Sequence, residues 1–156
     1  MKSDRGSKVT IVSIAVSPEK GTRKAQVSEA ELVPGHGLLS DAHAGDWHRQ
    51  VSFLGAEQIE QARAKGFDVG FGDFAENIAT TGVEWKKVPV GTRVRLGKAA
   101  LVEITQIGKK CHARCAVFQA VGDCIMPREG VFARVLKGGV IRPGDPAQIM
   151  EGDVLA

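Results

Sequence analysis

This chain of 156 residues has no long apolar stretch. The candidate run, Val9 to Val16, is interrupted by Thr10 and Ser13 and is far too short to cross a bilayer. It also lacks the small-residue cleavage pattern of a signal peptide, so we expect a cytoplasmic protein that does not contact membranes. A strong excess of one charge is absent too. The net charge of +3 leaves room for anionic small ligands but does not indicate a nucleic-acid partner.

Cysteine is scarce, and all three cysteines lie in the segment KKCHARCAVFQAVGDC, residues 109–124. Three cysteines cannot all pair within one chain, and cytoplasmic thiols stay mostly reduced, so no disulfide framework is expected. A zinc site could draw on Cys111, Cys115, Cys124 and His112. However, the spacing C-x3-C-x8-C matches none of the common zinc knuckles, so no metal site is predicted from the spacing.

Cys111 has the most cationic surroundings of the three thiols. Lys109, Lys110, His112 and Arg114 are its neighbours in sequence. Nearby cations stabilise a thiolate and lower the thiol pKa, which makes the sulfur a better nucleophile at neutral pH. Such a thiol could attack a donor persulfide and hold the terminal sulfur as Cys–S–SH. The alternative is that these cysteines are ordinary buried, inert side chains.

The chain has no internal repeat and no low-complexity linker, so we expect a single domain over residues 1–156, with 1–8 as a polar N-terminal arm. The 19 glycines indicate many turns and therefore short strands. A turn at Gly97-Lys98 is expected to join two of these strands. The segments predicted as strands are 9–16, 25–33, 50–54, 77–80, 93–96, 102–105 and both ends of 140–150. The predicted helices are 55–65, 114–121 and 128–137. This pattern predicts a mainly β fold, a small closed β-barrel with a few short helices.

The segment DAHAGDWHRQV, residues 41–51, places four possible metal ligands within eight residues. They are Asp41, His43, Asp46 and His48. A hydrolytic metal site can be built from such side chains. No further cluster of histidines or carboxylates elsewhere completes a ligand set. The alternative is a polar loop whose Asp and His side chains bond backbone amides.

A second polar segment, FGDFAENI, contains Asp73, Glu76 and Asn77. Two carboxylates three residues apart could perform acid–base chemistry. More often such side chains close turns. The sequence leaves both interpretations open.

Taken in order, three segments resemble the MOSC domain family, the molybdenum cofactor sulfurase C-terminal domains. They are GLLSDAHAGDWHRQVSFL, GDFAENIATTGV and VPVGTRVRLGKAALVEITQIGKKC, and the following CHARCAVFQAVGDCIMPREG continues the likeness. The resemblance runs from about Val9 to the end of the chain. It implies a mostly β, barrel-like fold and the handling of sulfur or of the molybdenum cofactor.

The resemblance also implies a set of site residues. The family cysteine follows a strand of the LVEIT type by a few residues, which maps it to Cys111. This residue would carry sulfur as a persulfide or ligate molybdenum, while Cys115 and Cys124 lie outside the shared position. We expect Cys111 to share one cleft with the residues predicted to bind molybdopterin. Those residues are Asp41, His43, Arg49, Asn77, Lys109, His112 and Arg114.

Arg49 is expected to contact an anion, the alternative being a structural ion pair with Asp41 or Asp46. One departure from the family pattern lies beside this loop. The family has Gly directly before the Asp of its D-x-HAG motif, and this chain has Ser40. If that position takes φ > 0, Ser40 is strained or the loop differs.

The resemblance implies partners as well. The chain is too short to hold a second, pyridoxal-phosphate domain, so we expect no pyridoxal-phosphate site and a separate cysteine desulfurase as sulfur donor. A molybdenum or tungsten enzyme, or a cofactor-synthesis protein, would receive the sulfur. The chain would then act as a carrier of the sulfurtransferase type. The alternatives are a non-catalytic module that binds molybdopterin or an oxyanion with Cys111 on the metal, and a small zinc-binding protein.

Overall fold

A computed structural model describes residues 9–19, 23–108 and 129–150. Within these residues the fold is mainly β, as the sequence predicts, with a single α-helix. The strands are β1 Thr10–Val16, β2 Ala25–Val27, β3 Ala30–Val33, β4 Gly37–Leu38, β5 Val51–Gly55, β6 Ile78–Thr81, β7 Arg93–Leu96, β8 Ala100–Ile107, β9 Val131–Lys137, β10 Gly139–Ile141 and β11 Ala147–Met150. The helices are α1 Ala56–Ala64 and the 3-10 turn η1 Trp85–Lys87. No helix in the described ranges combines the length and apolarity needed to span a membrane.

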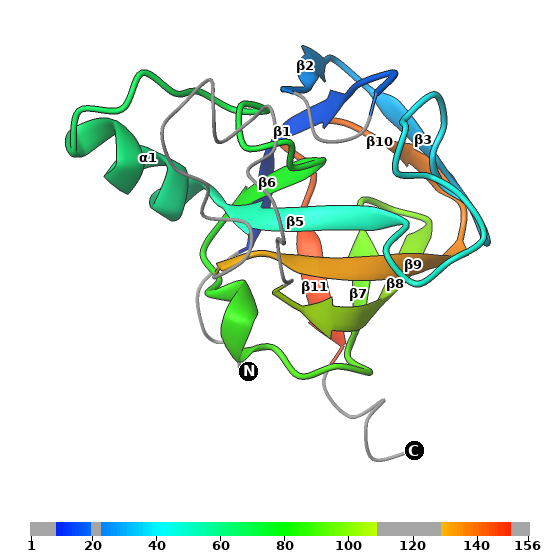
Figure 1. The fold of residues 1–156 in the computed structure, drawn as a ribbon. Helices are drawn as coiled ribbons and strands as arrows, with labels where there is room; N and C mark the ends of the chain where they lie inside the picture. The colour runs from blue at the N-terminus through cyan, green and yellow to red at the C-terminus, as the bar shows by residue number, and fades with distance from the viewer. Residues whose placement is uncertain (1–8, 20–22, 109–128, 151–156) are drawn as a thin grey trace.

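Two sheets make up the fold (Figure 1). The larger has eight strands in the order β11-β7-β8-β9-β5-β6-β1-β2, and the smaller has the order β10-β3-β4. Helix α1 connects β5 to β6, which run parallel to each other. The expected closed barrel is not shown, because this order leaves β11 and β2 as edges. Contact between β1 and the chain before β11 is limited to an isolated bridge, Thr10 to Pro146, and a few backbone hydrogen bonds.

Hydrophobic side chains form two buried clusters. The larger cluster draws on both sheets and includes Phe53, Trp85 and Ile104. The smaller lies between α1 and the large sheet and includes Ile59 and Phe74. In β7 the alternation predicted from sequence is observed, with the two arginines exposed and the two apolar side chains buried. Period-two alternation puts one face of such a strand in the core.

Most of the segment predicted as a helix over 128–137, residues 131–137, is instead the strand β9. It pairs with β8 on one side and β5 on the other. Its two faces pack into different hydrophobic clusters, Val131 and Ala133 into the larger and Phe132 into the smaller, so all three consecutive apolar residues are buried. Apolar residues at consecutive positions also fit the apolar stripe of a helix, so the spacing by itself wrongly predicted a helix here.

Other boundaries differ from the predictions. Leu96 pairs with Ala100, so the hairpin loop has three residues, Gly97 to Ala99, rather than the two-residue turn. The predicted strand 25–33 is divided into β2 and β3, which belong to different sheets. The predicted helix 55–65 is confirmed as α1. The predicted helix 114–121 lies outside the described residues.

Candidate functional site

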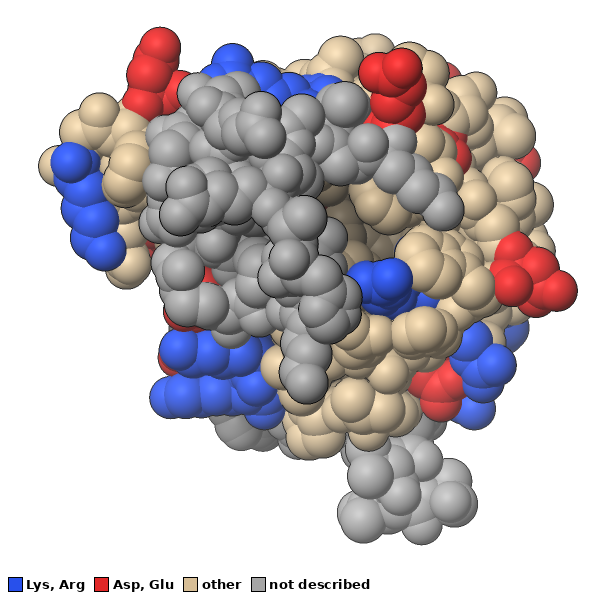
Figure 2. All heavy atoms as spheres, in the orientation of Figure 1, with Lys and Arg blue, Asp and Glu red and all other residues tan. Residues whose placement is uncertain are grey.

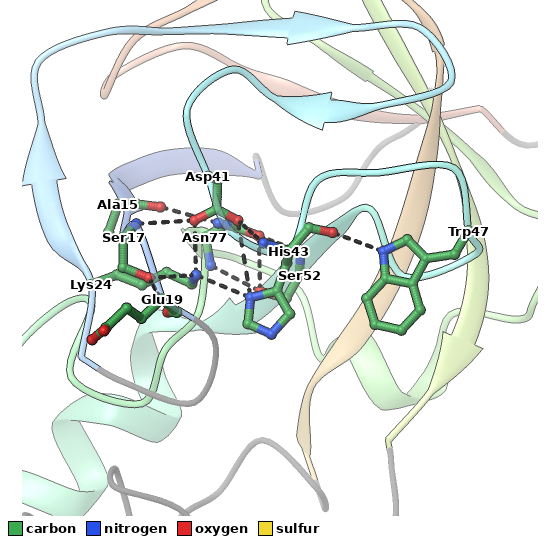
Figure 3. A network of polar contacts seen from close by, with 9 residues as sticks. All are labelled: Ala15, Ser17, Glu19, Lys24, Asp41, His43, Trp47, Ser52 and Asn77. Atoms are coloured by element: carbon green, nitrogen blue, oxygen red, sulfur yellow. Dashed lines mark hydrogen bonds and ion pairs between the residues drawn. The ribbon is translucent and has the colours of Figure 1, made fainter.

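A buried ion pair lies at the centre of a polar network beside β1 (Figure 3). The ammonium Nζ of Lys24 is 2.8 Å from Asp41 Oδ1, and both side chains are fully shielded from solvent. The same Nζ lies 3.2 Å from Ser17 Oγ and 3.1 Å from His43 Nδ1. The short segment before β2 therefore meets the loop after β4, although the two are well separated in sequence.

Asp41 is held in its ionised form. Burial by itself raises the pKa of a carboxyl, but the hydrogen bond and charge of Lys24, with hydrogen bonds from Asn77 and Ser17, hold the pKa of Asp41 below its usual 3.8. The backbone N–H of Ser17 donates to Oδ1 at 3.0 Å, and the backbone N–H of His43 donates to Oδ2 at 3.1 Å. These bonds make Asp41 the fixed negative charge that orders the loop.

The structure supports the polar-loop interpretation of residues 41–48 over the metal interpretation. Asp41 caps backbone amides, and its remaining partner is an ammonium where a metal ion would have to lie. His48 lies with Nε2 2.7 Å from Oε1 of Gln106 on strand β8, away from Asp41. In the described part of the chain, no three His, Cys, Asp or Glu side chains are arranged to hold a metal ion.

Ser40 precedes this loop with a φ of 72°, in the left-handed region. The departure from the family glycine noted in the sequence therefore falls on a position that does take positive φ. A residue with a Cβ is strained there, typically by roughly 1–2 kcal/mol. The backbone N–H of Asp41 donates to Leu38 O across this turn at 3.1 Å, which keeps the turn closed despite the strain.

Asn77, which lies directly before β6, connects the network to strands β1 and β5. Its side chain is buried, donates through Nδ2 to Ala15 O at 3.1 Å and accepts through Oδ1 from the backbone N–H of Ser52 at 3.0 Å. Its own backbone N–H donates to Ser52 Oγ at 2.9 Å. Asn77 thus joins β1, β5 and β6 behind Asp41, and the structure brings these two predicted residues together.

Arg49 lies close to two aromatic rings. Its guanidinium carbon lies 4.5 Å from the centre of the Trp47 ring and 5.5 Å from that of Phe132. Its Nε is shielded from solvent and has no hydrogen-bond partner in the described residues. The alternative of an ion pair with Asp41 or Asp46 is not observed within those residues, since Asp41 is taken by Lys24.

Trp47 connects Arg49 to the network. Its indole Nε1 donates to the backbone carbonyl of His43 at 2.7 Å, and in Figure 3 the two rings point to the same side. Next to this loop lies a hollow of about 570 Å³, lined in part by Trp47, His48, Glu103 and Arg134. Figure 2 shows a hollow in the tan surface near the centre of the view, with a basic side chain at its edge.

Glu76 closes a turn. Its carboxylate accepts from the backbone N–H of Gly72 at 2.6 Å and of Phe74 at 3.2 Å, and Asp73 accepts from Gly70 N–H at 2.8 Å. These bonds favour the turn-closing interpretation of the two carboxylates. Burial raises the pKa of Glu76 to about 7, against the lowering effect of these donors. The same turn positions Lys24, whose backbone N–H donates to Gly72 O at 2.8 Å.

Several predicted residues lie outside the described part of the chain. They are Cys111, Lys109, His112, Arg114, Cys115 and Cys124. The described strands on either side are joined by the backbone bond from Gly108 N–H to Gly130 O at 2.7 Å. The shared cleft between Cys111 and the Asp41–Arg49 loop therefore stays a prediction. Lys24 was missed, because nothing in SPEKGTRKAQ distinguishes it from the other basic residues of a turn-rich stretch.

The described fold and site define a mainly β domain in which a loop with a buried ion pair and a stacked arginine is held against the strand edges. The MOSC domain family model matches residues 40–148, and the chain belongs to this family. No curated protein sequence matches it. Solved structures with a similar fold include YuaD from Bacillus subtilis, at 16% identity with a TM-score of 0.74, covering 90% of this chain and 95% of that one.

A second similar structure is YiiM from Geobacillus stearothermophilus, at 22% identity with a TM-score of 0.70, covering 92% of this chain and 75% of that one. YiiM from Escherichia coli is similar at 19% identity with a TM-score of 0.64, covering 94% of this chain and 70% of that one. At these identities the likeness is one of fold.

Proposed function

We propose that this chain is a sulfur carrier in molybdenum or tungsten cofactor metabolism, with the sulfur on Cys111 and an anion-binding site at Arg49. MOSC domains are associated with molybdenum cofactor metabolism. The observation that carries the proposal is the buried Nε of Arg49, which has no partner in the described residues.

Arg49 combines a positive charge, a position fixed by two aromatic rings and a buried Nε–H donor without a partner in the described residues. A guanidinium has five N–H donors, and burying a donor without a partner costs about 1–3 kcal/mol. Trp47 and Phe132 hold the group by cation–π contact, so its orientation is fixed before any ligand arrives. An oxyanion would satisfy the donors in a bidentate fork, which a lysine could not match.

The residues present fit an anionic cofactor group. Arg49 would bind the phosphate of a molybdopterin, and His43 would lie beside it on the same loop, with Asp41 and Asn77 keeping that loop in place. When bound, the cofactor supplies a molybdenum or tungsten ion that can take sulfur as a ligand. Lys109, His112 and Arg114 would add positive charge from the segment that carries Cys111.

The sulfur-transfer step is thiol–persulfide exchange. The Cys111 thiolate attacks the terminal sulfur of a persulfide on a pyridoxal-phosphate cysteine desulfurase. A new S–S bond forms to Cys111, the donor's S–S bond breaks, and the donor cysteine leaves as a thiolate. The cationic neighbours of Cys111 favour the thiolate that begins this step.

Arg49→Ala tests the anion site. We expect phosphate or molybdate binding to weaken by about 1.5–3 kcal/mol, because a charge-assisted contact is lost, with a smaller loss in the free energy of unfolding. The measurements are isothermal titration and thermal melts. Arg142→Ala is the matched control, because Arg142 pairs with Glu29 on the surface and should leave binding unchanged. A large fall in melting temperature with unchanged affinity would mean that Arg49 is structural.

Cys111→Ser tests the carrier step. After incubation with a cysteine desulfurase and cysteine, mass spectrometry should find a persulfide on Cys111 of the wild type and none on the variant. Limited alkylation at neutral pH should label Cys111 first, and Cys124→Ser is the control that should keep loading. Labelling of Cys115 or Cys124 with Cys111 untouched in the folded protein would rule out the proposed carrier residue.

A binding module is the second candidate, favoured by the same Arg49 Nε, which has no hydrogen-bond partner in the described residues. In it the chain holds molybdopterin or an oxyanion, and Cys111 ligates the metal without carrying sulfur. Elemental analysis of protein purified without a metal-affinity tag separates the candidates. Stoichiometric molybdenum or tungsten supports the module, the absence of metal supports the carrier, and stoichiometric zinc supports a small zinc protein with Cys111, Cys115 and Cys124 as ligands.

A further inference from the structure

We infer that Lys24 is a positioning residue that fixes His43 as the neutral tautomer with its hydrogen on Nε2. His43 then acts as a hydrogen-bond donor to an oxygen of the bound oxyanion. The ligand half of this inference rests on the proposed function. The tautomer half stands on the hydrogen-bond geometry around Lys24.

The hydrogens of Lys24 can be assigned one by one. An ammonium has three N–H donors and no acceptor, and among the described residues Nζ has three polar neighbours within 3.2 Å, namely Asp41 Oδ1, Ser17 Oγ and His43 Nδ1. The Ser17 hydroxyl donates its own hydrogen to Glu19 O at 2.8 Å, so its oxygen is an acceptor toward Lys24. The third hydrogen therefore goes to Nδ1 of His43.

Asp41 is the competing partner for the imidazole, and distance decides against it. His43 Nδ1 lies 4.0 Å from Asp41 Oδ2, too far for a hydrogen bond, and 3.1 Å from Lys24 Nζ. Oδ2 instead accepts the backbone N–H of His43 at 3.1 Å. The ionised Asp41, 2.8 Å from Nζ, keeps Lys24 in its ammonium form.

An imidazole that accepts at Nδ1 carries its hydrogen on Nε2. The Nε2–H is a donor and cannot ligate a metal ion. His43 would therefore recognise an oxygen acceptor, as on phosphate or molybdate, and would not join a metal centre. Its side chain is 15% exposed, so the ring is not sealed in the core as Lys24 and Asp41 are.

Two-dimensional NMR of the histidine ring nitrogens measures the tautomer directly. We expect wild-type His43 to show an unprotonated Nδ1 and a protonated Nε2 at neutral pH, with its signals assigned by their loss in His43→Asn. In Lys24→Met the two tautomers should mix. Because that variant leaves the Asp41 carboxylate buried without its partner, Lys24→Met/Asp41→Asn removes both charges and preserves a folded protein for the comparison, checked by circular dichroism.

A wild-type His43 protonated at Nδ1 would overturn the inference, and so would a pure Nε2–H tautomer in the folded double variant. For the ligand, titration with phosphate or molybdate should shift the His43 Nε2–H signal. In the double variant the dissociation constant should rise by about tenfold, the usual effect of losing one oriented hydrogen bond. A His43 signal that stays unmoved at saturating anion would overturn its role as donor. Failure of persulfide loading on Cys111 would sink the carrier proposal without changing these spectra, so the two failures are distinguishable.

Discussion

At the scale of single residues, the pair of Lys24 and Asp41 has no solvent contact and several hydrogen bonds. Burying two charges is costly, and their attraction repays that cost only when the remaining donors and acceptors are satisfied. Here the ammonium has three acceptors and the carboxylate accepts from two backbone amides as well as Lys24. The pair therefore specifies the loop geometry more than it adds stability.

Removing one partner alone, as in Lys24→Met, is expected to lower the free energy of unfolding by about 3–5 kcal/mol, because the other charge stays buried without its partner.

Glu76 makes stability depend on pH. Burial raises its pKa in the folded protein from 4.5 to about 7, so folding takes up a proton between these values. Stability from this group is fully present below pH 4.5 and is lost as pH rises to about 7. Over that range the wild type should lose about 3 kcal/mol relative to Glu76→Gln, whose amide does not titrate. Urea unfolding of both proteins at a series of pH values measures this difference.

Because the other titrating groups are common to both proteins, they largely cancel in that comparison. A wild-type advantage that grows with pH would contradict the expectation. It would mean that the amides of Gly72 and Phe74, at 2.6 and 3.2 Å, stabilise the carboxylate more than burial destabilises it.

At the scale of elements, the site depends on two loops that approach other backbones closely. A Cβ on Gly37 would lie 2.6 Å from Gln50 O, and a Cβ on Gly72 would lie 2.3 Å from Lys24 O. The loop that ends at β5 and the turn that precedes β6 can therefore reach their partners only with glycine at these positions. Gly72 contacts the backbone of Lys24 and also donates to Glu76, so the conformation of the Glu76 turn determines where Lys24 lies.

Gly72→Ala should disturb that contact. Its φ of +90° and the clash with Lys24 O both oppose a side chain, so we expect a loss of more than about 2 kcal/mol in the free energy of unfolding. Gly66→Ala is the matched control. Gly66 has a φ of +103° and open space around it, so it should lose only about 1 kcal/mol for the backbone strain. Equal losses in the two variants would show that the contact with Lys24 is unimportant.

At the scale of the whole molecule, one core joins the two sheets. The larger cluster contains Leu32 and Leu38 from the small sheet with Phe53 and Trp85 from the other part of the fold. Trp85 packs against Phe53 with ring centres 5.0 Å apart, and its Nε1 donates to Thr80 Oγ1 at 2.7 Å. Shared burial of this kind couples the sheets during unfolding.

We therefore expect a single cooperative unfolding transition. The chain has two tryptophans, so in Trp47→Phe the tryptophan fluorescence comes from Trp85 alone. Its fluorescence and the far-ultraviolet circular dichroism should give the same midpoint in urea. Separate midpoints would mean that the small sheet unfolds independently and that the predicted single domain should be divided.

Much of the fold was predictable because local pattern and environment agree. The strand β1, the helix α1, the alternation of β7 and the ends of the segment 140–150 were all anticipated from apolar spacing and glycine positions. In each of these segments the spacing of apolar residues in the sequence agrees with the side chains that the structure buries. The family, too, was recognisable from the order of its motifs, and the family model confirms it.

The site was only partly predictable. Asp41, His43, Arg49 and Asn77 stand in recognisable motifs, and the structure brings Asp41, His43 and Asn77 into one network. Lys24 has no such motif. A lysine acquires its role from what surrounds it, and that depends on a meeting of residues 17, 24, 41 and 43 that no local pattern encodes.

The sequence by itself determined the mainly β class, the family and the motifs that contain Asp41, His43, Arg49 and Asn77. Only the tertiary structure decided that residues 131–137 form a central strand, because the partners β5 and β8 and the two clusters that bury its faces come from distant parts of the chain. Tertiary packing also decided which charges are partnered. Asp41 pairs with Lys24 rather than with Arg49, and the backbone hydrogen bond from Lys24 to Gly72 helps to hold the lysine beside it. Arg49 is thereby left stacked on Trp47 with its Nε unpaired in the described part of the chain.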